Sequence, residues 1–368
     1  MSSAPARPFL GVDGLLAEAR RRTGAVIAPL LERVEPRAAE VLAYQWGWVD
    51  AEGKRVPEGG RGRGKAVRAA LVFAAARACG RADAGGDGLL PAGAAAVEML
   101  HALSLLHDDV MDKDEVRRGR PAAWRVFGSD AVETAVRTLT PYALDLVFAD
   151  SAEAPGQEAR PGRAEGLRAS VRAAGLLGHA LVRLGQGQAL DLALEDEPCP
   201  EVAATLRVHA DKTGSLFACA CALGATPETA DDLAVFGEHL GMAFQIVDDV
   251  LGIWGDPAVT GKPAGADLTA RKKSHPVAVA LAPDPARADA AVPRRLRELY
   301  ALCGPWTPAQ RGEVRGLLDR SGARSVSGAA AREYERSALA ALARVCPPSG
   351  EAGADLRALA AFAVGRSC

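Results

Sequence analysis

The sequence has few aromatic residues, no paired cysteine motif, and no stretch approaching the ~20 uncharged apolar residues that a transmembrane helix needs. Phe, Trp and Tyr make up 5% of the 368 residues, so Ala, Leu and Val must fill most of the core. The seven cysteines include no Cys-x-x-Cys pair, which argues against a zinc site and a disulfide framework. The first residues, Met1–Pro8, lack the apolar run of a signal peptide. We therefore expect a reduced, cytoplasmic protein without a membrane span.

Neither sign of charge dominates the sequence. It has 44 Lys and Arg residues against 46 Asp and Glu residues, a formal net charge of -2. A protein that binds nucleic acid needs an excess of basic residues to neutralise the phosphates. The balance therefore argues against a nucleic-acid partner, although it leaves room for a local cationic pocket that binds a small anion.

Helical periodicity runs through most of the chain. Apolar residues recur three and four positions apart, and alternating stretches of the β-strand type are nearly absent. We therefore predict an all-α fold, in which one domain spans residues 1–368 and residues 1–20 form a flexible N-terminal extension. The Gly-, Pro- and Asp-rich segments 80–91, 150–162 and 281–293 are predicted to be loops. The predicted helices cover residues 13–31, 65–79, 94–107, 165–184, 199–223, 229–254 and 329–345.

An aspartate cluster ends one of the apolar helices. Asp108 and Asp112 are four residues apart, so on a helix both carboxylates leave the same face, and Asp109 is adjacent. Negative charge at a helix C-terminus opposes the helix dipole, so an exposed acidic turn is a weak explanation. Carboxylates bridged by Mg²⁺ to a phosphate explain the cluster better, because Arg117, Arg118 and Arg120 follow it and arginines bind phosphate.

A second aspartate cluster ends another apolar helix. Asp248 and Asp249 close the apolar run, and Gln245 lies three residues before Asp248 on the same helix face. A glycine-rich segment carrying Lys262 and Lys272 follows. One Asp-Asp pair is common by chance. Two pairs, each ending an apolar helix and each followed by basic loop residues, form a specific signal for metal and diphosphate binding.

These motifs resemble those of the trans-isoprenyl diphosphate synthases, the polyprenyl synthetase family. His-Asp-Asp-Val-Met-Asp at 107–112, with Arg-Arg-Gly-Arg-Pro at 117–121, resembles the family's first aspartate-rich motif, and residues 244–256 resemble the second. The resemblance covers about residues 20–365 and implies an all-α bundle around a central active-site cavity, usually in a homodimer. Further elements occur in the family's order: Gly-Lys-Ala-Val-Arg at 64–68, Gly-Gln-Ala-Leu-Asp at 187–191 and Lys-Thr-Gly at 212–214.

The resemblance implies head-to-tail prenyl transfer between isopentenyl diphosphate and an allylic diphosphate. Three Mg²⁺ ions would act as Lewis acids on the departing diphosphate. Asp108, Asp112 and Asp248 would hold them, with Asp109 and Asp249 in support. The other roles fall on residues that match the family's motifs. Arg117, Lys212, Lys262 and Lys272 would hold the allylic diphosphate, Lys65, Arg68, His101 and Arg118 would hold the diphosphate of isopentenyl diphosphate, and Thr213 and Gln245 would stabilise the allylic cation.

The chain departs from the family pattern at several positions. Gly252 stands where the second motif has its third Asp, and Ala66 and Ala69 replace a basic residue and a proline of the first basic element. Residues 128–144 lack the usual signature after the first motif, which can reshape the chain-binding wall or a dimer contact. Residues 44–63 form an unusual insertion with two tryptophans, interpreted as a lid or as a plain surface loop. We expect activity to survive the change at Gly252, because the family's metal contact is mainly the first Asp.

Other polar residues have plain structural interpretations. His107 fits a structural hydrogen bond as well as a catalytic role, and His179, His209 and His239 are expected to be surface or packing residues. Lys273 is the alternative to Lys272 as a ligand of the allylic diphosphate, because the register of a loop can shift by one residue.

Product length is predicted from the helix before the first motif. In the family, a bulky aromatic residue about one turn before the first Asp stops chain growth, and here Leu100, Leu103 and Ser104 are not aromatic. We therefore expect a C20 product, geranylgeranyl diphosphate, with C15 as the alternative.

Two other functions stay open. A class I terpene cyclase shares the fold and the metal chemistry but has no second substrate, so Lys65, Arg68 and Arg118 would have no role. An aromatic content of 5% is also thin for a cyclase cavity. A non-catalytic subunit would have lost metal ligands that are present here.

Overall fold

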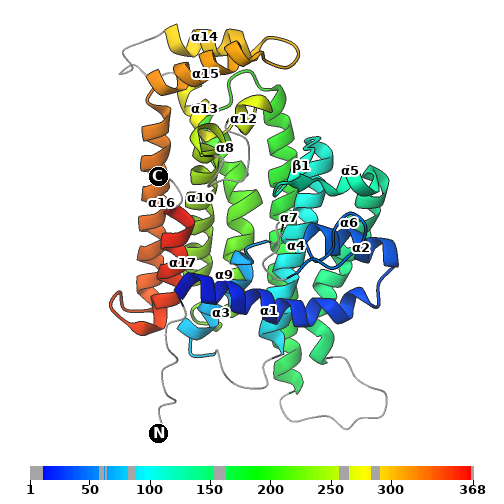
Figure 1. The fold of residues 1–368 in the computed structure, drawn as a ribbon. Coiled ribbons are helices and arrows are strands. Elements are labelled where there is room, and N and C mark those ends of the chain that lie inside the picture. Colours follow the sequence, from blue (N-terminus) through cyan, green and yellow to red (C-terminus); the bar gives the residue numbers. More distant parts are fainter. Residues whose placement is uncertain are drawn as a thin grey trace. The chain divides into compact units, whose positions relative to one another are not determined.

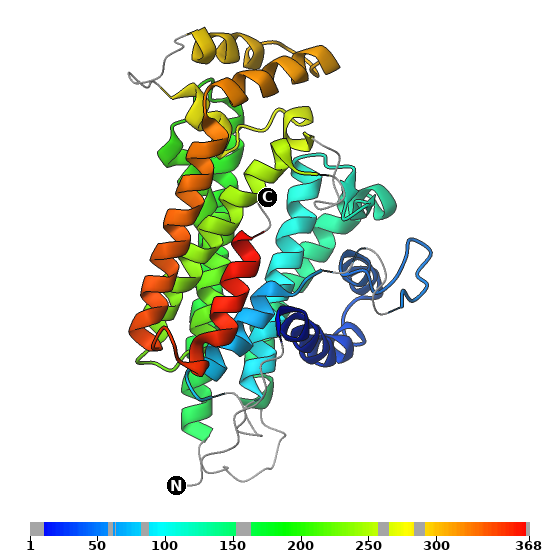
Figure 2. The same ribbon diagram turned by 60° about the vertical axis from the view of Figure 1, so that its left-hand side comes forward.

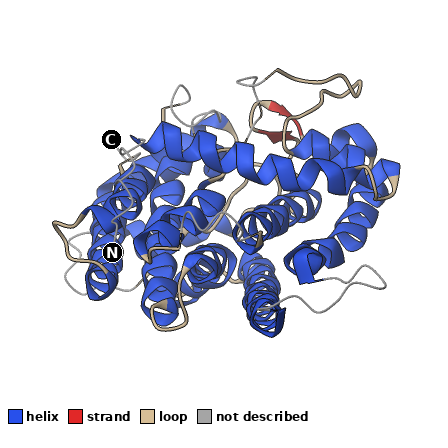
Figure 3. Cartoon of the chain, turned by 90° about the horizontal axis from the view of Figure 1, so that it is seen from below, coloured by secondary structure: helices blue, strands red, loops and turns tan. Residues whose placement is uncertain are grey.

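The computed structural model describes residues 11–57, 62, 64–81, 88–151, 163–256, 265–282 and 291–365. Nearly all of this part is helical (Figure 3), which confirms the all-α prediction. In chain order the elements are α1 (Gly11–Leu31), α2 (Pro36–Gln45), α3 (Val67–Ala78), α4 (Leu89–Met111), β1 (Val116–Arg117), β2 (Arg120–Pro121), α5 (Ala123–Phe127), α6 (Ser129–Asp145), η1 (Leu146–Ser151), α7 (Arg163–Asp196), α8 (Val202–His209), η2 (Ala210–Gly214), α9 (Ser215–Gly224), α10 (Ala230–Trp254), α12 (Ala266–Thr269), α13 (His275–Leu281), α14 (Ala291–Tyr300), α15 (Pro308–Arg320), α16 (Ala323–Val345), η3 (Glu351–Gly353) and α17 (Ala354–Val364).

The chain divides into two compact units. The first contains residues 1–178, 219–234 and 342–362, and the second contains residues 179–218, 235–341 and 363–368. The helices α7, α9, α10, α16 and α17 each contribute residues to both. The expectation of one domain over the whole chain stays a prediction.

The first unit is built around α4. This helix packs against α1, α3 and α6, and Figures 1 and 2 show α1, in dark blue, crossing it. By length and composition α4 is apolar enough to span a membrane, although no membrane span is expected from the sequence. However, 67% of its most apolar window is buried inside the protein, as in a core helix. The small residues of α3, buried from Val67 to Ala76, pack against it.

A short antiparallel hairpin follows α4 and carries the arginines of the first motif (red in Figure 3). Val116 pairs with Pro121, and Arg117 pairs with Arg120. Its strands have two residues each, too short for an alternating pattern to be visible in the sequence. The described part of the insertion, up to residue 57, forms a tight turn that is closed by a bridge between Val49 and Arg55.

The second unit contains the second aspartate motif, on α10. Its apolar core gathers residues of α10 and of α12 to α16, including Ile253, Leu268, Leu296 and Trp306. The helix predicted over 199–223 is interrupted, because α8 ends at His209 and the π-helical turn η2 precedes α9. Such turns are rare and are often found at functional sites.

Several predicted boundaries differ from the observed ones. α4 begins at Leu89, α7 continues to Asp196, and α16 begins at Ala323, so each is longer than its periodic core indicated. α1 begins at Gly11, so the second half of the predicted N-terminal extension is helical. Residues 152–162 and 283–290 of the predicted loops lie outside the described residues. The stretch 128–144 folds mainly as α6.

Candidate active site

The first two predicted metal ligands lie on the last turn of α4. The Asp112 N–H donates to the Asp108 carbonyl at 2.8 Å, which continues the helical pattern to the C-cap. Asp108 is half-buried and Asp112 is exposed. The helix therefore places both carboxylates on one accessible face, as the spacing predicted.

Asp109, between them, is turned inward and bound to Arg117. The Asp109 side chain is 1% exposed, and Arg117 Nε lies 2.9 Å from Oδ1 and 3.1 Å from Oδ2, while Nη2 also donates to Oδ1. Burial raises the pKa of Asp109, although the hydrogen bond and the charge of Arg117 act to lower it. Burial would lower the pKa of Arg117, but the bond to Asp109 raises it. Asp109 thus fixes the base of the hairpin to α4.

The hairpin turns at Arg118 and Gly119. Their φ angles are +52° and +73°. Two central residues with positive φ are typical of a type I′ turn, which normally uses glycine or asparagine at the position that Arg118 occupies. A strained arginine of this kind persists only where surrounding contacts hold it, and such strain concentrates at functional sites.

Arg118 belongs to a group of basic side chains that includes Arg68 and His101. Burial lowers the pKa of Arg68 to about 10, Glu98 opposes this shift, and Arg118 adds to it. The pKa of His101 lies well below its usual value because of burial and then because of the charges of Arg68, Arg118 and Arg117. The structure therefore brings together three of the four residues predicted to hold the isopentenyl diphosphate.

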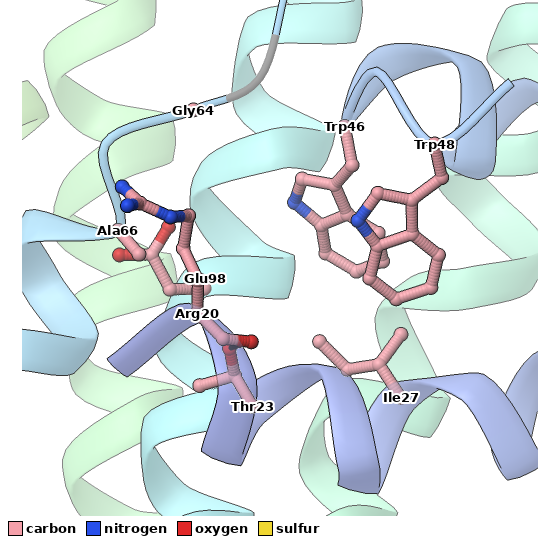
Figure 4. Close-up of a pocket in the computed structure, with 8 residues that line it drawn as sticks. All are labelled: Arg20, Thr23, Ile27, Trp46, Trp48, Gly64, Ala66 and Glu98. Carbon is pink, nitrogen blue, oxygen red and sulfur yellow. Dashed lines mark hydrogen bonds between the residues drawn. The ribbon is translucent and has the colours of Figure 1, made fainter. Parts of the chain in front are cut away.

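Lys65, the fourth, precedes α3 and is exposed, with its Nζ 5.2 Å from the centroid of the Phe362 ring. The adjacent Ala66 has φ +56° and starts α3 from a left-handed conformation. A cavity of about 50 Å³ lies beside this segment (Figure 4). It has room for water but is far smaller than the ligand pockets of about 300 Å³ or more, so it holds neither substrate. Its lining residues are Arg20, Thr23, Ile27, Trp46, Trp48, Gly64, Ala66 and Glu98.

In the second unit, Asp249 is buried on α10 and accepts hydrogen bonds from several donors. His209 Nε2 lies 3.0 Å from Oδ2, the His275 backbone N–H donates to Oδ2 at 2.9 Å, and Gln245 Nε2 donates to Oδ1 at 3.1 Å. Burial opposes ionisation of this carboxyl, but His209, then Lys272, and the His275 N–H hold its pKa below the usual value. Asp249 is thus an internal anchor.

This anchor orients Gln245. A carboxylate can only accept hydrogen bonds, so the amide nitrogen must face Asp249 and the amide oxygen must point away from it. The Thr213 hydroxyl donates to that oxygen at 2.7 Å. Asp248, about 100° round the helix from Asp249, is half-buried. Gln245 and Thr213, the two residues expected to stabilise the allylic cation, are therefore in contact.

The π-turn η2 is held by ion pairs on both sides. Lys212 Nζ lies 2.8 Å from Asp191 Oδ2 on α7. Arg183, also on α7, donates to Asp211 Oδ1 and to Glu238 Oε2 of α10, each at 2.8 Å. Arg183 thus connects α7, η2 and α10, and fixes the turn that carries Lys212.

Two glycines allow the neighbouring helices to approach η2 closely. A Cβ atom on Gly187 would lie 2.9 Å from the Lys212 backbone nitrogen, and one on Gly241 would lie 2.8 Å from the Gly214 Cα. Both contacts are too short for any side chain. The glycine of the Gly-Gln-Ala-Leu-Asp element therefore has a packing role.

The segment after the second motif is only partly described. Lys273 Nζ donates to the Glu195 and Glu197 carbonyls, each at 2.6 Å, and so caps the C-terminal end of α7. Lys272 is exposed, and its charge acts on Asp249. Lys262, a predicted ligand of the allylic diphosphate, lies outside the described residues.

Gly252 lies directly against the carboxylate of Asp267. A Cβ atom built at position 252 would overlap the Asp267 carboxylate. A carboxylate from α12 therefore stands where the side chain of a third motif aspartate would begin.

The available carboxylates suit a hard divalent cation. Within the described ranges, no three or more His, Cys, Asp and Glu side chains form a ready-made metal site. Mg²⁺ is usually held by one or two carboxylates together with water and substrate phosphates. The accessible Asp108 and Asp112 meet this requirement, and Asp248 offers a further half-buried carboxylate.

Sequence reasoning missed several residues that organise the site. His209 was expected to be a surface or packing residue, but it is 6% exposed and bound to Asp249. Its position, one helical turn before Lys-Thr-Gly, is the one sequence feature that could have indicated a role in the site. Nothing in the sequence near Arg183 indicates its role, because its partners are remote in sequence. Arg120 was grouped with the phosphate-binding arginines, but it binds the backbone carbonyls of Tyr44 and Val49. These residues lie where α2 ends and the insertion begins, a stretch that we call the 44–49 turn.

Known proteins share this sequence and fold. Residues 60–301 match the family model described as Polyprenyl synthetase. The chain is 38% identical over 367 residues to the geranylgeranyl diphosphate synthase of Mycobacterium tuberculosis, covering 96% of this chain and 94% of that protein. It is 33% identical over 344 residues to the (2E,6E)-farnesyl diphosphate synthase of Mycobacterium bovis, covering 92% and 88%. The crystal structure of a polyprenyl synthetase from Streptomyces coelicolor A3(2) matches with a TM-score of 0.82 and 34% identity, over 96% of this chain and 99% of that one. The resemblance seen in the motifs is confirmed, and the chain belongs to the polyprenyl synthetase family of metal-dependent transferases that act on isoprenyl diphosphates.

Proposed function

We propose that this enzyme condenses isopentenyl diphosphate head-to-tail with allylic diphosphates and makes geranylgeranyl diphosphate as its main product. The observation that carries the proposal is the group formed by Arg68 of α3, Arg118 of the hairpin turn and His101 of α4. The Ala69 N–H donates to Glu98, one turn before His101, at 3.1 Å, and the charges of Arg68 and Arg118 both act on His101. A second set of candidate phosphate-binding residues, Lys212 and Lys272, is held by other elements. Two sets of basic residues suit two diphosphate substrates.

In the proposed reaction, the bond between C1 and oxygen of the allylic diphosphate breaks, and the double bond of isopentenyl diphosphate attacks C1. A proton then leaves to the released diphosphate. The Gln245 oxygen is turned away from Asp249, and the Thr213 hydroxyl donates a hydrogen bond to that oxygen. The remaining lone pairs of both groups are available to stabilise the allylic cation. Bound Mg²⁺, proposed as three ions on Asp108, Asp112 and Asp248, would neutralise the charge of the departing diphosphate.

The main rival is a cyclase that ionises one longer diphosphate. For a two-substrate enzyme, Arg68→Ala should raise the KM for isopentenyl diphosphate far more than the KM for the allylic partner. The reason is that the Arg68 guanidinium is proposed to bind the diphosphate of isopentenyl diphosphate alone. A hydrocarbon released from a C15 or C20 diphosphate alone would favour the cyclase.

Product length is proposed from α4. Leu100 and Leu103 are buried, and Ser104 is half-buried with its hydroxyl donating to the His101 carbonyl at 2.9 Å. None blocks a growing chain as an aromatic ring would, and each added isoprene unit buries more apolar carbon, at about 0.8 kcal/mol per CH₂. Leu103→Phe or Ser104→Phe should shift the product from C20 toward C15. Leu103→Ile, which conserves the volume, should leave the product unchanged, and an unchanged product in both Phe variants would contradict the length assignment.

We also propose a cytoplasmic homodimer. On the part of α7 that belongs to the first unit, Leu167 and Val171 are 48% and 57% exposed and lie one turn apart, on one helical stripe. A second copy of the chain covering this stripe would bury it. Val171→Asp should then convert the dimer to a monomer in light scattering, whereas a monomeric parent protein would contradict the proposal.

A further inference from the structure

The tryptophan-bearing insertion is fastened to the β1–β2 hairpin. Arg120 of β2 donates from Nη2 to the Tyr44 carbonyl at 2.6 Å and from Nη1 to the Val49 carbonyl at 3.2 Å. Its guanidinium carbon lies 4.4 Å from the centroid of the Tyr44 ring. The Tyr44 hydroxyl in turn donates to the Pro121 carbonyl at 2.8 Å. We call these contacts between Arg120, Pro121, Tyr44 and Val49 the latch.

The latch holds one strand of a strained turn, and Asp109 holds the other. Arg117 is paired directly with Arg120 across the hairpin and is bound to Asp109 of α4. Arg118 lies at the apex between them, with its left-handed backbone, and its Nη1 lies 3.4 Å from the Gln45 carbonyl. A strained arginine clamped from both strands has few alternative conformations. The two clamps therefore define where the Arg118 guanidinium is presented.

The insertion also shares a cavity with the segment before α3. The ring centroids of Trp46 and Trp48 are 5.2 Å apart, and Figure 4 shows both indoles across the small cavity from Gly64 and Ala66. A Cβ atom on Gly64 would lie 3.1 Å from the Arg118 guanidinium. The 44–49 turn thus contacts the hairpin that carries Arg118, and it lines one small cavity together with the segment that carries Lys65.

We propose that Arg120 and the 44–49 turn are a positioning device for Arg118, which sets its guanidinium for the diphosphate of isopentenyl diphosphate. The inference rests on the proposed function, which gives Arg118 that ligand. Both terminal nitrogens of Arg120 are used by backbone carbonyls, so this arginine acts through its neighbour and not on phosphate directly. The described part of the insertion is accordingly a support for the hairpin and not a lid.

The test compares Arg120→Met, Arg120→Lys and Tyr44→Phe with the parent enzyme. Calorimetry measures the binding of isopentenyl diphosphate, and steady-state assays measure the KM for each substrate and kcat. Arg120→Met should weaken isopentenyl diphosphate binding about tenfold, with the KM for the allylic substrate within about twofold. Arg120→Lys, which keeps the charge but not the fork of two donors, should lose about threefold. Arg137→Met, which removes an exposed arginine of α6, is the matched control and should change nothing.

A double variant of Tyr44 and Arg120, and Arg118→Ala as a reference, distinguish a failure of the latch from a failure of the proposed function. Tyr44→Phe combined with Arg120→Met should be no worse than Arg120→Met, because both side chains serve one latch. Normal isopentenyl diphosphate binding in Arg120→Met, while Arg118→Ala loses it, would overturn the latch and leave the proposed function intact. Equal loss for both substrates, or a loss that follows only a lower Tm, would also overturn it. A parent enzyme that does not bind isopentenyl diphosphate would contradict the proposed function together with the latch.

Discussion

His209 Nε2 lies 3.0 Å from Asp249 Oδ2, and both side chains are almost completely buried. This pair joins α8 to α10 within the second unit. It matters to the site because Asp249 also orients the Gln245 amide, whose oxygen accepts from Thr213. A histidine outside the recognised motifs therefore determines how two proposed catalytic groups point.

We predict that His209→Ala lowers the free energy of unfolding by about 1–3 kcal/mol, since the buried Asp249 loses a hydrogen-bond partner. It should also lower kcat, because Asp249, without this partner, can shift and carry the Gln245 amide with it. His209→Gln, whose amide nitrogen can replace Nε2, should recover part of both losses. His179→Ala, at an exposed position of α7, is the control. Urea unfolding and steady-state kinetics measure the effects, and wild-type values for His209→Ala would show that the pair has no such role.

The burial of His275 should make the free energy of unfolding depend on pH. An unfolded imidazole has a pKa of about 6.5, and burial lowers the pKa of His275 in the folded protein to about 4. Between these values the unfolded chain binds the proton more readily, so the free energy of unfolding decreases as pH falls from about 6.5 to about 4, by up to about 3 kcal/mol.

The variant His275→Asn lacks this titration and keeps a polar group near Ser327, the partner of Nδ1 at 2.9 Å. Its stability should therefore fall less than that of the wild type over the same pH range. Chemical denaturation at several pH values measures the difference, and parallel curves for the two proteins would refute the assignment to His275.

Restoring the family's third aspartate should harm this chain. In Gly252→Asp, the new side chain would overlap the Asp267 carboxylate and place like charges together. We expect a loss of about 1–3 kcal/mol in the free energy of unfolding and lower activity. Gly252→Asp combined with Asp267→Gly should recover much of the loss. A single Gly252→Asp variant that is more stable or more active than the parent would contradict this account.

The proposed metal ligands predict separate losses of activity. Asp108→Ala or Asp248→Ala should lower kcat by about two orders of magnitude or more, because each removes about 3 kcal/mol or more of charge stabilisation in the transition state. Circular dichroism should show an unchanged helical content in both. A rate near that of the wild type at saturating Mg²⁺ would show that the mutated residue is not a metal ligand.

Much of the fold follows from local sequence. The apolar periodicity of α4 and α10 predicts both helices, and the i, i+4 spacing of Asp108 and Asp112 predicts their shared face. Local patterns of this kind depend only on neighbours within a few turns. The helix ends were less predictable, because their caps depend on partners elsewhere, as when Lys273 caps α7.

The supporting contacts were beyond sequence reasoning for the same reason. His209 is 40 positions from Asp249, and Arg120 is 76 positions from Tyr44, so no spacing rule joins them. The run Arg-Arg-Gly-Arg predicts phosphate binding by charge alone. Only the hairpin geometry shows that Arg117 and Arg120 are bound within the protein on either side of Arg118.

The central claim, condensation of two diphosphates, is tested most directly by product formation from defined substrates. The purified enzyme is incubated with labelled isopentenyl diphosphate, Mg²⁺ and one allylic diphosphate at a time, and the products are separated by chain length. We predict a labelled C20 diphosphate that forms only when both substrates are present and that disappears when a chelator removes the metal. No labelled prenyl diphosphate with any allylic partner, or a hydrocarbon formed from the allylic diphosphate alone, would contradict the claim.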